Sequence, residues 1–473
     1  MGDHMFIRKP AVAGQFYDSD ADRLRAEVDY YLKAVRPVKG RVFGVLAPHA
    51  GYAYSGATAG AAFSFLREAD FDTVVIIGTG HTAPVAGAAI MSEGFFETPL
   101  GRVEIDSGLA RALLASSGLF EDLPSAHTRE HSVEVELPFL QALGKTFKFV
   151  PVVANTADLK TLEELGKHVG KAVKGRKAVI CVSSDLSHYP PGEIAEKSDR
   201  ALLEALRTAV GNADLSYFSL ANDLLLAKSK FYMDTAACGY SAMVIGAAAC
   251  MELGAGGFKL LEYTHSGKIM GDDRRVVGYG AGLFTGGGRK PRGLGAELKA
   301  ELLALARKTI EDRLRNKKSA EPPMSVHPEL NQPAAVFVTL HKEGALRGCI
   351  GTMTPRQLLS DAVAAFAAAS AFEDPRFEPL SAGELARVKI EISVLSPLRR
   401  VESYLDVVEK KHGVYVRNGS SGGTYLPQVW AHFNSREEFL NSLCAEKAGL
   451  PASAWKEKST ALYVYTVDSF EEN

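Results

Sequence analysis

The stretch Val42–Gly56, VFGVLAPHAGYAYSG, decides how the first part of this chain folds. It begins with an apolar run that predicts a buried strand, and the run stops at Pro48. His49 follows at once, in a turn that also holds Gly51. In open α/β sheets, ligands bind at the carboxyl ends of the parallel strands. His49 is therefore a candidate metal ligand or base, or else a polar plug at the sheet edge.

Short apolar segments alternate with helix-like segments through the first part of the chain. Strands are expected at residues 42–47, 73–77, 147–153 and 178–183. Helices are expected between and after them, at 57–68, 109–116, 159–173 and 239–252, and two closing strands at 259–264 and 276–284. This alternation predicts an α/β domain with a central, largely parallel or mixed sheet flanked by helices.

The pattern breaks at residues 285–295, TGGGRKPRGLG. Five glycines, a proline and three basic residues without hydrophobic periodicity indicate an interdomain linker. Beyond it, helices are expected at 298–316, 357–371 and 436–448, and strands at 334–341, 345–350, 388–395, 414–417, 425–429 and 462–467. Hairpins mixed with helices favour an α+β fold. The sequence thus predicts two domains, residues 5–284 and 296–473.

Composition and charge narrow the class of protein. The 473 residues carry a formal net charge of −2, so no global field draws the chain to nucleic acid or to an anionic membrane. The sequence has no apolar run of about 18 residues, so no membrane span is expected. Its five cysteines are unevenly spaced, which favours a reducing, cytoplasmic environment over a disulfide framework.

Reactive side chains follow several of the expected strands in the first domain. They are His49, His81, Asp185, His188 and Cys238. Cys238 precedes an expected helix, and a thiol at a helix N-terminus has a lowered pKa. Two neutral imidazoles and one anion form the ligand set of many non-haem iron sites, and the anion here could be Cys238, Asp185 or Asp234. Together these strand ends predict a metal or catalytic site.

Each of these residues also has a purely structural interpretation. A histidine in a glycine-rich turn often bonds only to backbone groups. Asp185 could cap the turn that follows its strand, which is a common role for aspartate. Cys238, taken alone, is more often a small buried hydrophobe than a reactive thiol. It is the joint pattern of several strand ends in one sheet that favours a functional site.

A fifth segment, residues 127–140 (HTREHSVEVELPFL), adds two histidines and three acidic residues. His127 and His131 are four residues apart, which would put them on one face of a helix. The sequence is not HExxH, however, so it does not predict a zinc protease site. Glu134 and Glu136 are most simply placed on a solvated face.

The segments APHAGYAYSG, GTGH, EHSVEVELPFL, SSDLSHY and DTAACGYSA occur in an order that resembles the Memo family. Memo proteins are similar in fold to the LigB-like class III extradiol dioxygenases, which hold Fe(II) with two histidines and a carboxylate. The resemblance implies that His49 and His81 are the metal histidines and that Cys238 stands where those enzymes have a glutamate ligand. His188 matches the acid/base histidine, with Asp185 beside it.

The resemblance also implies a cofactor and a substrate pocket. The expected cofactor is one mononuclear metal ion, iron rather than copper or zinc, although a soft thiolate ligand shifts preference toward Cu(I) or zinc. Tyr52, Tyr54 and His131 are expected to bind the substrate. The expected reaction is the oxidation of a small molecule in the presence of dioxygen or a redox partner.

The segments LRGCIGTM, FEDPRFEPL, EISVLSPL, HGVYV and TYLPQV make the second domain similar to the AMMECR family. Arg347 and Cys349 lie on an expected hairpin strand, where Cys349 could be an activated thiol or simply a buried strand residue. Asp374, Arg376 and His412 could join it in a cleft, or could form a structural ion pair and a turn.

Proteins similar to the two domains are members of the AmmeMemoRadiSam set, whose third member is a radical S-adenosylmethionine protein. This chain lacks the CxxxCxxC cluster motif, so the resemblance implies that a separate radical protein is its partner. Two other functions stay open. Cys238 could be the nucleophile of a hydrolase, with His188 as base and Asp185 as its orienter. The chain could also be a non-enzymatic adaptor that binds a metal or a peptide.

Overall fold

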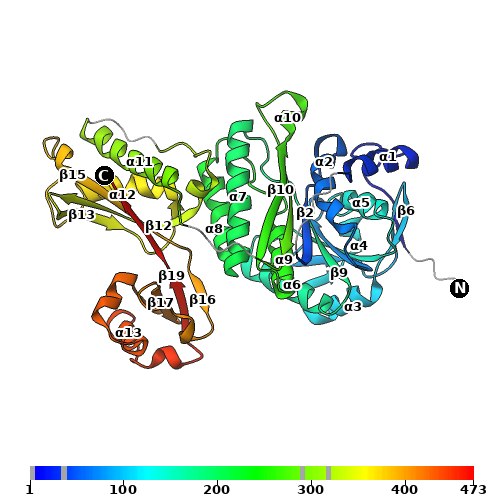
Figure 1. The fold of residues 1–473 in the computed structure, drawn as a ribbon. Helices are drawn as coiled ribbons and strands as arrows, with labels where there is room; N and C mark the ends of the chain where they lie inside the picture. Colours follow the sequence, from blue (N-terminus) through cyan, green and yellow to red (C-terminus); the bar gives the residue numbers. More distant parts are fainter. Residues whose placement is uncertain (1–5, 34–39, 288–292, 316–320, 473) are drawn as a thin grey trace. The chain divides into compact units, whose positions relative to one another are not determined.

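The structure, a computed structural model, describes residues 6–33, 40–287, 293–315 and 321–472. Its backbone contacts divide the chain into two units, Met1–Lys290 and Pro291–Asn473. This division falls inside the expected linker, of which residues 288–292 lie outside the described part of the chain. Figure 1 shows both units and labels many of their elements.

The first unit is built on an eight-stranded sheet in the order β10-β11-β2-β9-β3-β8-β4-β7. The strands are β2 (Val42–Ala47), β3 (Thr73–Thr79), β4 (Ala88–Ile90), β7 (Phe120–Asp122), β8 (Lys148–Ala154), β9 (Ala178–Ser183), β10 (Gly257–His265) and β11 (Gly278–Thr285). Neighbours from β2 to β8 are parallel, whereas β10, β11 and β2 pair antiparallel. The expected mixed sheet is thereby confirmed. All seven residues of β3 are buried, which matches its unbroken apolar sequence.

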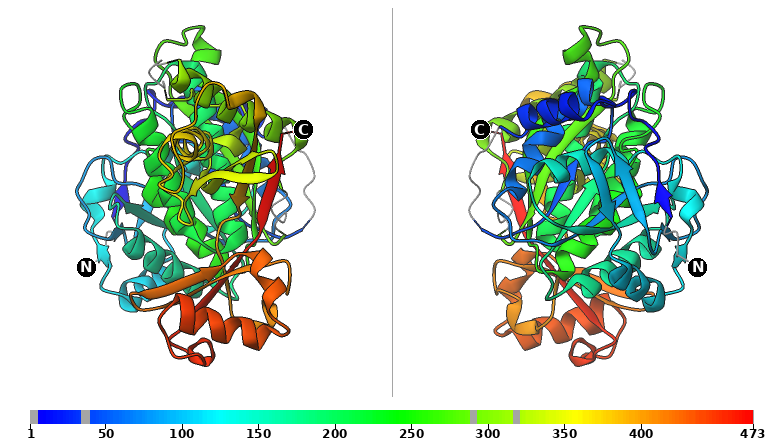
Figure 2. Two further views of the ribbon diagram at one scale, coloured as in Figure 1. Left: turned by 90° about the vertical axis from the view of Figure 1, so that its left-hand side faces the viewer. Right: turned by 90° about the vertical axis from the view of Figure 1, so that its right-hand side faces the viewer.

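Helices flank this sheet, and a three-stranded sheet of β1 (Ile7–Arg8), β5 (Phe95–Thr98) and β6 (Gly101–Glu104) completes the unit (Figure 2). The helices are α1 (Ala21–Tyr31), α2 (Tyr52–Phe63), α3 (Ser107–Ser116), α4 (Pro124–His127), α5 (Leu137–Ala142), α6 (Leu159–Val173), α7 (Gly192–Asn212), α8 (Leu215–Lys228), α9 (Tyr240–Glu252) and α10 (Ser266–Met270). Helix α6 packs closely on α9. A Cβ on Gly166 would lie 2.4 Å from the carbonyl oxygen of Ile245, so only glycine fits there.

The sheet order brings the reactive residues to one edge. Strands β2, β9 and β3 are parallel neighbours, so their carboxyl ends lie side by side. His49, Asp185 and His81 each come two residues after one of these strands. Cys238 lies just before α9, which contacts β9 and β3. The order of strands and helices therefore places His49, His81, Asp185 and Cys238 at the same end of the sheet.

Helix α2 begins earlier than its sequence pattern suggested. It occupies Tyr52–Phe63 instead of residues 57–68, so Gly56 lies inside the helix and not in the turn. A Cβ on Gly56 would lie 2.4 Å from the ring of Tyr31 on α1. This glycine therefore serves the packing of α1 on α2.

The second unit contains a five-stranded sheet, β13-β12-β15-β20 with β14 beside β12, and a four-stranded sheet, β16-β19-β17-β18. Its elements are α11 (Ala296–Leu314), β12 (Pro333–Lys342), β13 (Ala345–Gly351), β14 (Gln357–Leu358), α12 (Leu359–Phe372), β15 (Val388–Leu395), β16 (Arg399–Val401), β17 (Gly413–Asn418), β18 (Ser421–Tyr425), α13 (Arg436–Ser442), β19 (Ala461–Tyr465) and β20 (Val467–Glu471). Helices α11 and α12 cover the first sheet with one apolar core, and the second sheet has another.

One expected strand of the second unit is wrong. Residues 425–429 do not form a strand, because β18 is Ser421–Tyr425 and a 3₁₀ segment, Pro427–His432, follows it. Pro427 has no N–H to donate to a sheet. Gly422 and Gly423 hid the true strand, because glycine is depleted in strands generally. A Cβ on Gly423 would lie 2.5 Å from the backbone of Lys447.

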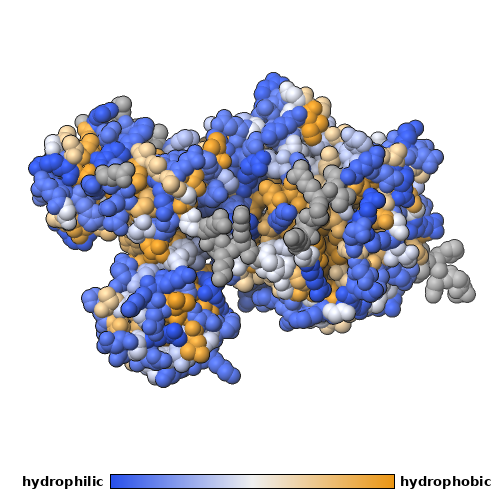
Figure 3. Space-filling view, in the orientation of Figure 1, coloured by the Kyte–Doolittle hydropathy of each residue, from blue (hydrophilic) through white to orange (hydrophobic). Residues whose placement is uncertain are grey.

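The surface is polar and the helices are short or charged. Charged and polar residues cover most of the face drawn in Figure 3, with apolar areas between them. None of the helices formed by the described residues is long and apolar enough to cross a membrane. This agrees with the absence of a long apolar run in the sequence.

Candidate metal centre

His49 lies at the centre of the candidate site, with only 2% of its surface exposed. Its Nδ1 is 2.9 Å from the hydroxyl oxygen of Ser183 on β9. That hydroxyl donates its own proton to the carbonyl of Ser132, at 2.6 Å, so it can only accept from His49. The proton of the neutral imidazole therefore lies on Nδ1. The Nε2 atom keeps its lone pair, as a metal ligand requires.

His49 is neutral in this setting. Burial lowers its pKa well below the usual value, and the nearby rings of His131, His81 and His188 lower it further. The rings of His49 and His81 meet nearly at right angles, with their centroids 5.3 Å apart. An uncharged imidazole is the form that binds metals.

His81 is oriented by a buried carboxylate, Glu130. Glu130 accepts hydrogen bonds from the Nδ1 of His81 at 3.0 Å and from its backbone N–H at 2.7 Å. The backbone N–H groups of His131 and Ser132 also donate to it. Burial alone would raise the pKa of Glu130, but the hydrogen bonds from His81 and Ser132 and the nearby rings outweigh burial and lower it to about 2. The carboxylate thus fixes the proton of His81 on Nδ1 and frees Nε2.

Cys238 completes the close contacts of His49. Its Sγ lies 3.1 Å from Nε2 of His49 and 3.7 Å from the carbonyl oxygen of Asp185. Burial raises the pKa of the Cys238 thiol well above its usual value, and the charge of Asp185 raises it further. The expectation of a lowered pKa is therefore wrong for the metal-free thiol, because burial outweighs the dipole of α9. A bound cation would supply the charge that removes this proton.

Among the described residues, the possible ligand atoms form two groups that share His49. One group is His49, His81 and His131, and the other is His49, Asp185 and Cys238, with all ligand atoms of a group within 4.8 Å of one another. Zinc and similar ions bind nitrogen at about 2.0–2.1 Å and sulfur at about 2.3 Å, so small side-chain movements would close either group. The residues therefore fit a metal ion. The predicted trio of His49, His81 and Cys238 draws on both groups and stays a prediction.

Asp185 and His188 have different surroundings. The Oδ1 of Asp185 accepts from the backbone N–H groups of His49 and Ala50, at 2.8 and 3.2 Å, so it holds the turn that carries His49. Burial raises the pKa of Asp185 to about 7. The Nε2 of His188 is buried with no hydrogen-bond partner among the described residues, and burial and His81 lower its pKa. No hydrogen bond of the described residues joins Asp185 to the ring of His188.

The three residues expected to bind substrate also have different surroundings. Tyr52 is buried, and its hydroxyl donates to the carbonyl of Val135 at 2.6 Å, as a core tyrosine does. Tyr54 is 39% exposed. His131 stacks on His81 with centroids 4.8 Å apart, so it lies within the metal cluster. A substrate role for these three residues stays a prediction.

Glu134 and Glu136 are fully buried, so their expected place on a solvated face is wrong. Glu134 pairs with the guanidinium of Arg8 and also accepts from two backbone N–H groups. Glu136 has no hydrogen-bond partner among the described residues. Burial raises its pKa well above the usual value, so the Glu136 carboxyl is neutral. Sequence reasoning missed the roles of Glu130, Ser183 and Arg8. The only local signal was the position of Glu130 directly before His131.

Family models agree with this arrangement of two units. Residues 8–283 match the family model described as Memo-like protein. The chain belongs to the Memo-like family. Residues 303–470 of this Memo-like protein match a second family model, AMMECR1, so the second unit is an AMMECR1 domain.

Curated relatives support the assignment of the Memo-like domain. MEMO1 family proteins of Methanopyrus kandleri and Methanothermobacter thermautotrophicus are each 37% identical, over 293 and 284 residues. These alignments span 59% and 58% of this chain and 99% and 98% of the relatives. A MEMO1 family protein of Methanococcoides burtonii is 40% identical over 282 residues, 58% of this chain and 98% of its own length.

Two solved structures also match. An uncharacterized protein of Pyrococcus horikoshii is 37% identical, with a TM-score of 0.33, and the match spans 38% of this chain and 94% of that one. An uncharacterized protein of Escherichia coli K12 is 10% identical, with a TM-score of 0.35, and the match spans 51% of this chain and 99% of that one.

In the AMMECR1 domain, three of the predicted residues, Cys349, Asp374 and Arg376, contact one another. The hydroxyl of Thr339 donates to the sulfur of Cys349 at 3.2 Å, and the backbone N–H of Cys349 donates to Asp374 at 2.8 Å. Arg376 forms two hydrogen bonds to the Asp374 carboxylate, at 2.9 and 2.7 Å, and a third to the Cys349 carbonyl. Arg347 faces Glu384 instead, at 3.2 Å.

His412 belongs to another part of the AMMECR1 domain. It precedes β17 in the four-stranded sheet, and its Nδ1 accepts from the backbone N–H of Val408 at 3.1 Å. Its carbonyl accepts from the indole of Trp430. No hydrogen bond or ion pair among the described residues links His412 to Cys349, so the structure does not bring the five predicted residues into one cluster.

Proposed function

We propose that the Memo-like domain is a redox metalloenzyme that binds one metal ion through His49, His81 and Cys238. Iron is the expected metal, and copper is the alternative because of the soft thiol ligand. One observation carries this proposal: Ser183 and Glu130 fix the protons of both imidazoles on Nδ1, so that both Nε2 atoms keep a lone pair for a metal ion. A purely structural histidine pair would not need both rings oriented in this way.

The bound ion would supply redox and Lewis-acid chemistry. The residues of the chain would hold it and handle protons. Asp185 fixes the turn that carries His49, and Glu130 fixes the ring of His81. His188 is neutral, and among the described residues its Nε2 has no hydrogen-bond partner, so it can accept a proton from a substrate and return it. This is the acid/base role proposed for His188.

Metal content tests the proposal most directly. Protein purified without oxygen or chelator is expected to hold about one iron or copper ion per chain, measured by elemental analysis. His49→Ala, His81→Ala and Cys238→Ala should each lose most of it. His168→Ala is the matched control, because His168 lies on α6 and its ring contacts Phe120. Unchanged metal content in the three variants would contradict the proposal.

We also propose that a radical S-adenosylmethionine protein is the partner of the chain. The presence of a Memo-like and an AMMECR1 domain in one chain supports this, through the resemblance to the AmmeMemoRadiSam set. Analytical ultracentrifugation of the full chain with such a protein from the same organism should show a complex. Complex formation that survives Cys238→Ser while no metal binds would favour the adaptor interpretation, in which the chain has no catalytic role.

The contact between Cys238 and His49 favours a second candidate function, that of a cysteine nucleophile. The Sγ···Nε2 distance of 3.1 Å is that of a thiol–imidazole pair. The base would then be His49 and not His188. The raised pKa of Cys238 argues against an activated thiol in the metal-free protein. Fast alkylation of Cys238 and hydrolysis of activated esters by metal-free protein would support this second function.

A further inference from the structure

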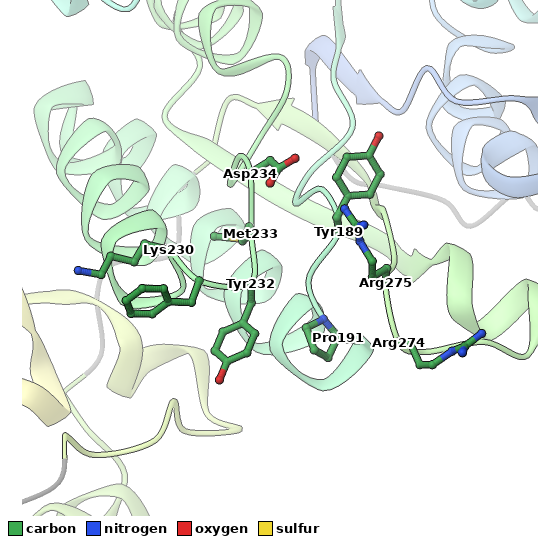
Figure 4. A pocket seen from close by; sticks show the side chains of 9 residues that line it. Tyr189, Pro191, Lys230, Tyr232, Met233, Asp234, Arg274 and Arg275 are labelled. Carbon is green, nitrogen blue, oxygen red and sulfur yellow. The ribbon is translucent and has the colours of Figure 1, made fainter.

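A pocket of about 260 Å³ lies beside Tyr189, the residue that follows His188, in the Memo-like domain (Figure 4). Three segments line it: the residues that follow β9, the connection between α8 and α9, and the connection between α10 and β11. None of the predicted metal ligands lines this pocket. It is therefore a site of its own and not the metal cluster.

The walls of the pocket are joined to the backbone of His188. Tyr189 follows His188 directly, and the N–H of Asp234 donates to the carbonyl of His188 at 3.1 Å. Tyr189 has a φ of +70°, a left-handed conformation that few residues other than glycine adopt. Its N–H donates to the carbonyl of Val276 at 2.7 Å, which holds it there. His188 itself does not line the pocket, but a molecule bound there would contact Tyr189 and Asp234, which are joined to the backbone of His188.

The charged groups of the pocket differ in whether they have partners. Arg274 forms two hydrogen bonds with the carboxylate of Asp272, at 2.9 and 2.6 Å, and it points away from the pocket in Figure 4. Arg275 lies over the ring of Tyr189, 4.8 Å from its centroid. No ion pair among the described residues includes Arg275 or Asp234. Lys230 also lines the pocket, but its ammonium group lies over the ring of Phe231 and points away from the other lining side chains in Figure 4. One guanidinium and one carboxylate are therefore left for a ligand.

Aromatic rings supply the remaining surface. Tyr189 and Tyr232 are 42% and 55% exposed, and both line the pocket. Exposed aromatic side chains gathered around a pocket are typical of binding sites, because their faces are available for stacking. The pocket thus offers a cation, an anion and ring faces within a volume that fits a small molecule.

We propose that this pocket binds a small zwitterion that carries an aromatic ring, the chemical class of free aromatic α-amino acids. The carboxylate of the ligand pairs with Arg275, its ammonium group pairs with Asp234, and its ring stacks on Tyr189 or Tyr232. The carboxylate of Asp234 would repel a simple anion, and the guanidinium of Arg275 would repel a simple cation. Only a ligand that carries both charges can pair with both side chains.

Binding of this ligand does not depend on the metal. Only a role for the bound ligand in the reaction at His188 rests on the proposed function. Isothermal titration of the metal-free full chain with L-phenylalanine measures the binding. The controls each lack one group: 3-phenylpropionate lacks the ammonium, phenethylamine the carboxylate and L-alanine the ring. L-phenylalanine should bind at least about tenfold more tightly than any of them, as expected for a lost ion pair or ring contact.

Two adjacent arginines provide matched variants. Arg275→Gln should weaken the binding of L-phenylalanine about tenfold or more, and Asp234→Asn should do the same. Arg274→Gln should leave it unchanged, because Asp272 already neutralises that side chain. Equal affinity for L-phenylalanine and 3-phenylpropionate, or equal loss in Arg274→Gln and Arg275→Gln, would overturn the inference. Circular dichroism of each variant verifies that it is folded.

The same measurement separates this inference from the proposed function. His49→Ala protein should bind L-phenylalanine as the parent does, although it has lost its metal. Parent protein that holds metal but does not bind L-phenylalanine would overturn the inference alone. Protein that binds L-phenylalanine but never takes up metal would support the inference and contradict only the proposed function.

Discussion

The histidine cluster of the Memo-like domain and the Cys349 cluster of the AMMECR1 domain use polar groups in opposite ways. In the first, Ser183 and Glu130 each bind Nδ1 of an imidazole and leave a lone pair on Nε2, which points to other candidate ligands. In the second, Arg376 and Asp374 satisfy each other, and the remaining bonds go to Cys349. Arg376 is also 53% exposed. A ligand site can therefore be recognised by side chains whose orientation is fixed by hydrogen bonds while one donor or acceptor atom still lacks a matching partner.

The largest expected effect concerns the pH dependence of stability at Asp185. Burial raises its folded-state pKa to about 7, so the folded protein keeps a proton that the unfolded chain releases. The free energy of unfolding therefore falls as the pH rises from about 4 to 7, by up to about 4 kcal/mol. Asp185→Asn should flatten this slope in urea denaturation of the metal-free protein.

Asp374 in the AMMECR1 domain should show the opposite sign. Its hydrogen bonds from Arg376 lower its pKa, so its contribution to stability is present at neutral pH and is lost as the pH falls. Asp374→Asn should therefore remove part of the fall in unfolding free energy at acidic pH, and it should leave the dependence at higher pH unchanged. Equal slopes in the two variants would break the comparison between the clusters.

The next effect concerns the third metal ligand. Cys238→Ser should lower the affinity for Co(II) or Cu(I) about hundredfold, because it replaces a soft thiolate with a weak ligand. His131→Ala should lower it less than about tenfold if His131 only stacks on His81. Competition with a chelating dye measures both affinities. The reverse order would assign the ion to the group of three histidines.

A smaller loss is expected from the carboxylate behind His81. Glu130→Gln should weaken metal binding about 10- to 100-fold, because the amide no longer fixes the proton of His81 on Nδ1. The matched variant in the other domain is Glu384→Gln, which removes the partner of Arg347. Its metal affinity should equal that of the parent. A loss in both would mean that the variants act through unfolding.

The smallest effect is expected at the exposed ion pair of the second domain. Arg376→Gln should change the stability of the AMMECR1 domain little, since ion pairs with a half-exposed partner contribute little. Thermal unfolding followed by calorimetry measures this. A loss as large as that of a buried pair would show that the Cys349 cluster carries more of the fold than its exposure indicates.

The sequence predicted the scaffold of the site better than its fine structure. Apolar runs located β2 and β9 to the residue, and the parallel order of the strands brought His49, Asp185 and His81 to one edge. Periodicity and glycine were less reliable guides, as the early start of α2 shows. The central strands can be predicted from local sequence, because a strand that is buried on both faces consists of a continuous run of apolar residues.

The partners that orient the rings could not be predicted, because they are distant in the sequence. Ser183 is 134 residues from His49, and Arg8 is 126 residues from Glu134. No local pattern links such pairs. The raised pKa of Cys238 was missed for a similar reason, since burial of its sulfur depends on several elements at once.

The neutral carboxyl of Glu136 gives the molecule a built-in sensor. It is fully buried, and burial favours its protonated form over the ionised one. A protonated carboxylic acid has a carbonyl vibration that neither water nor ionised carboxylates share, and the local electric field shifts its frequency. Difference infrared spectra, with Glu136→Gln to identify the band, could therefore follow charge that arrives in the neighbouring cluster without any added label.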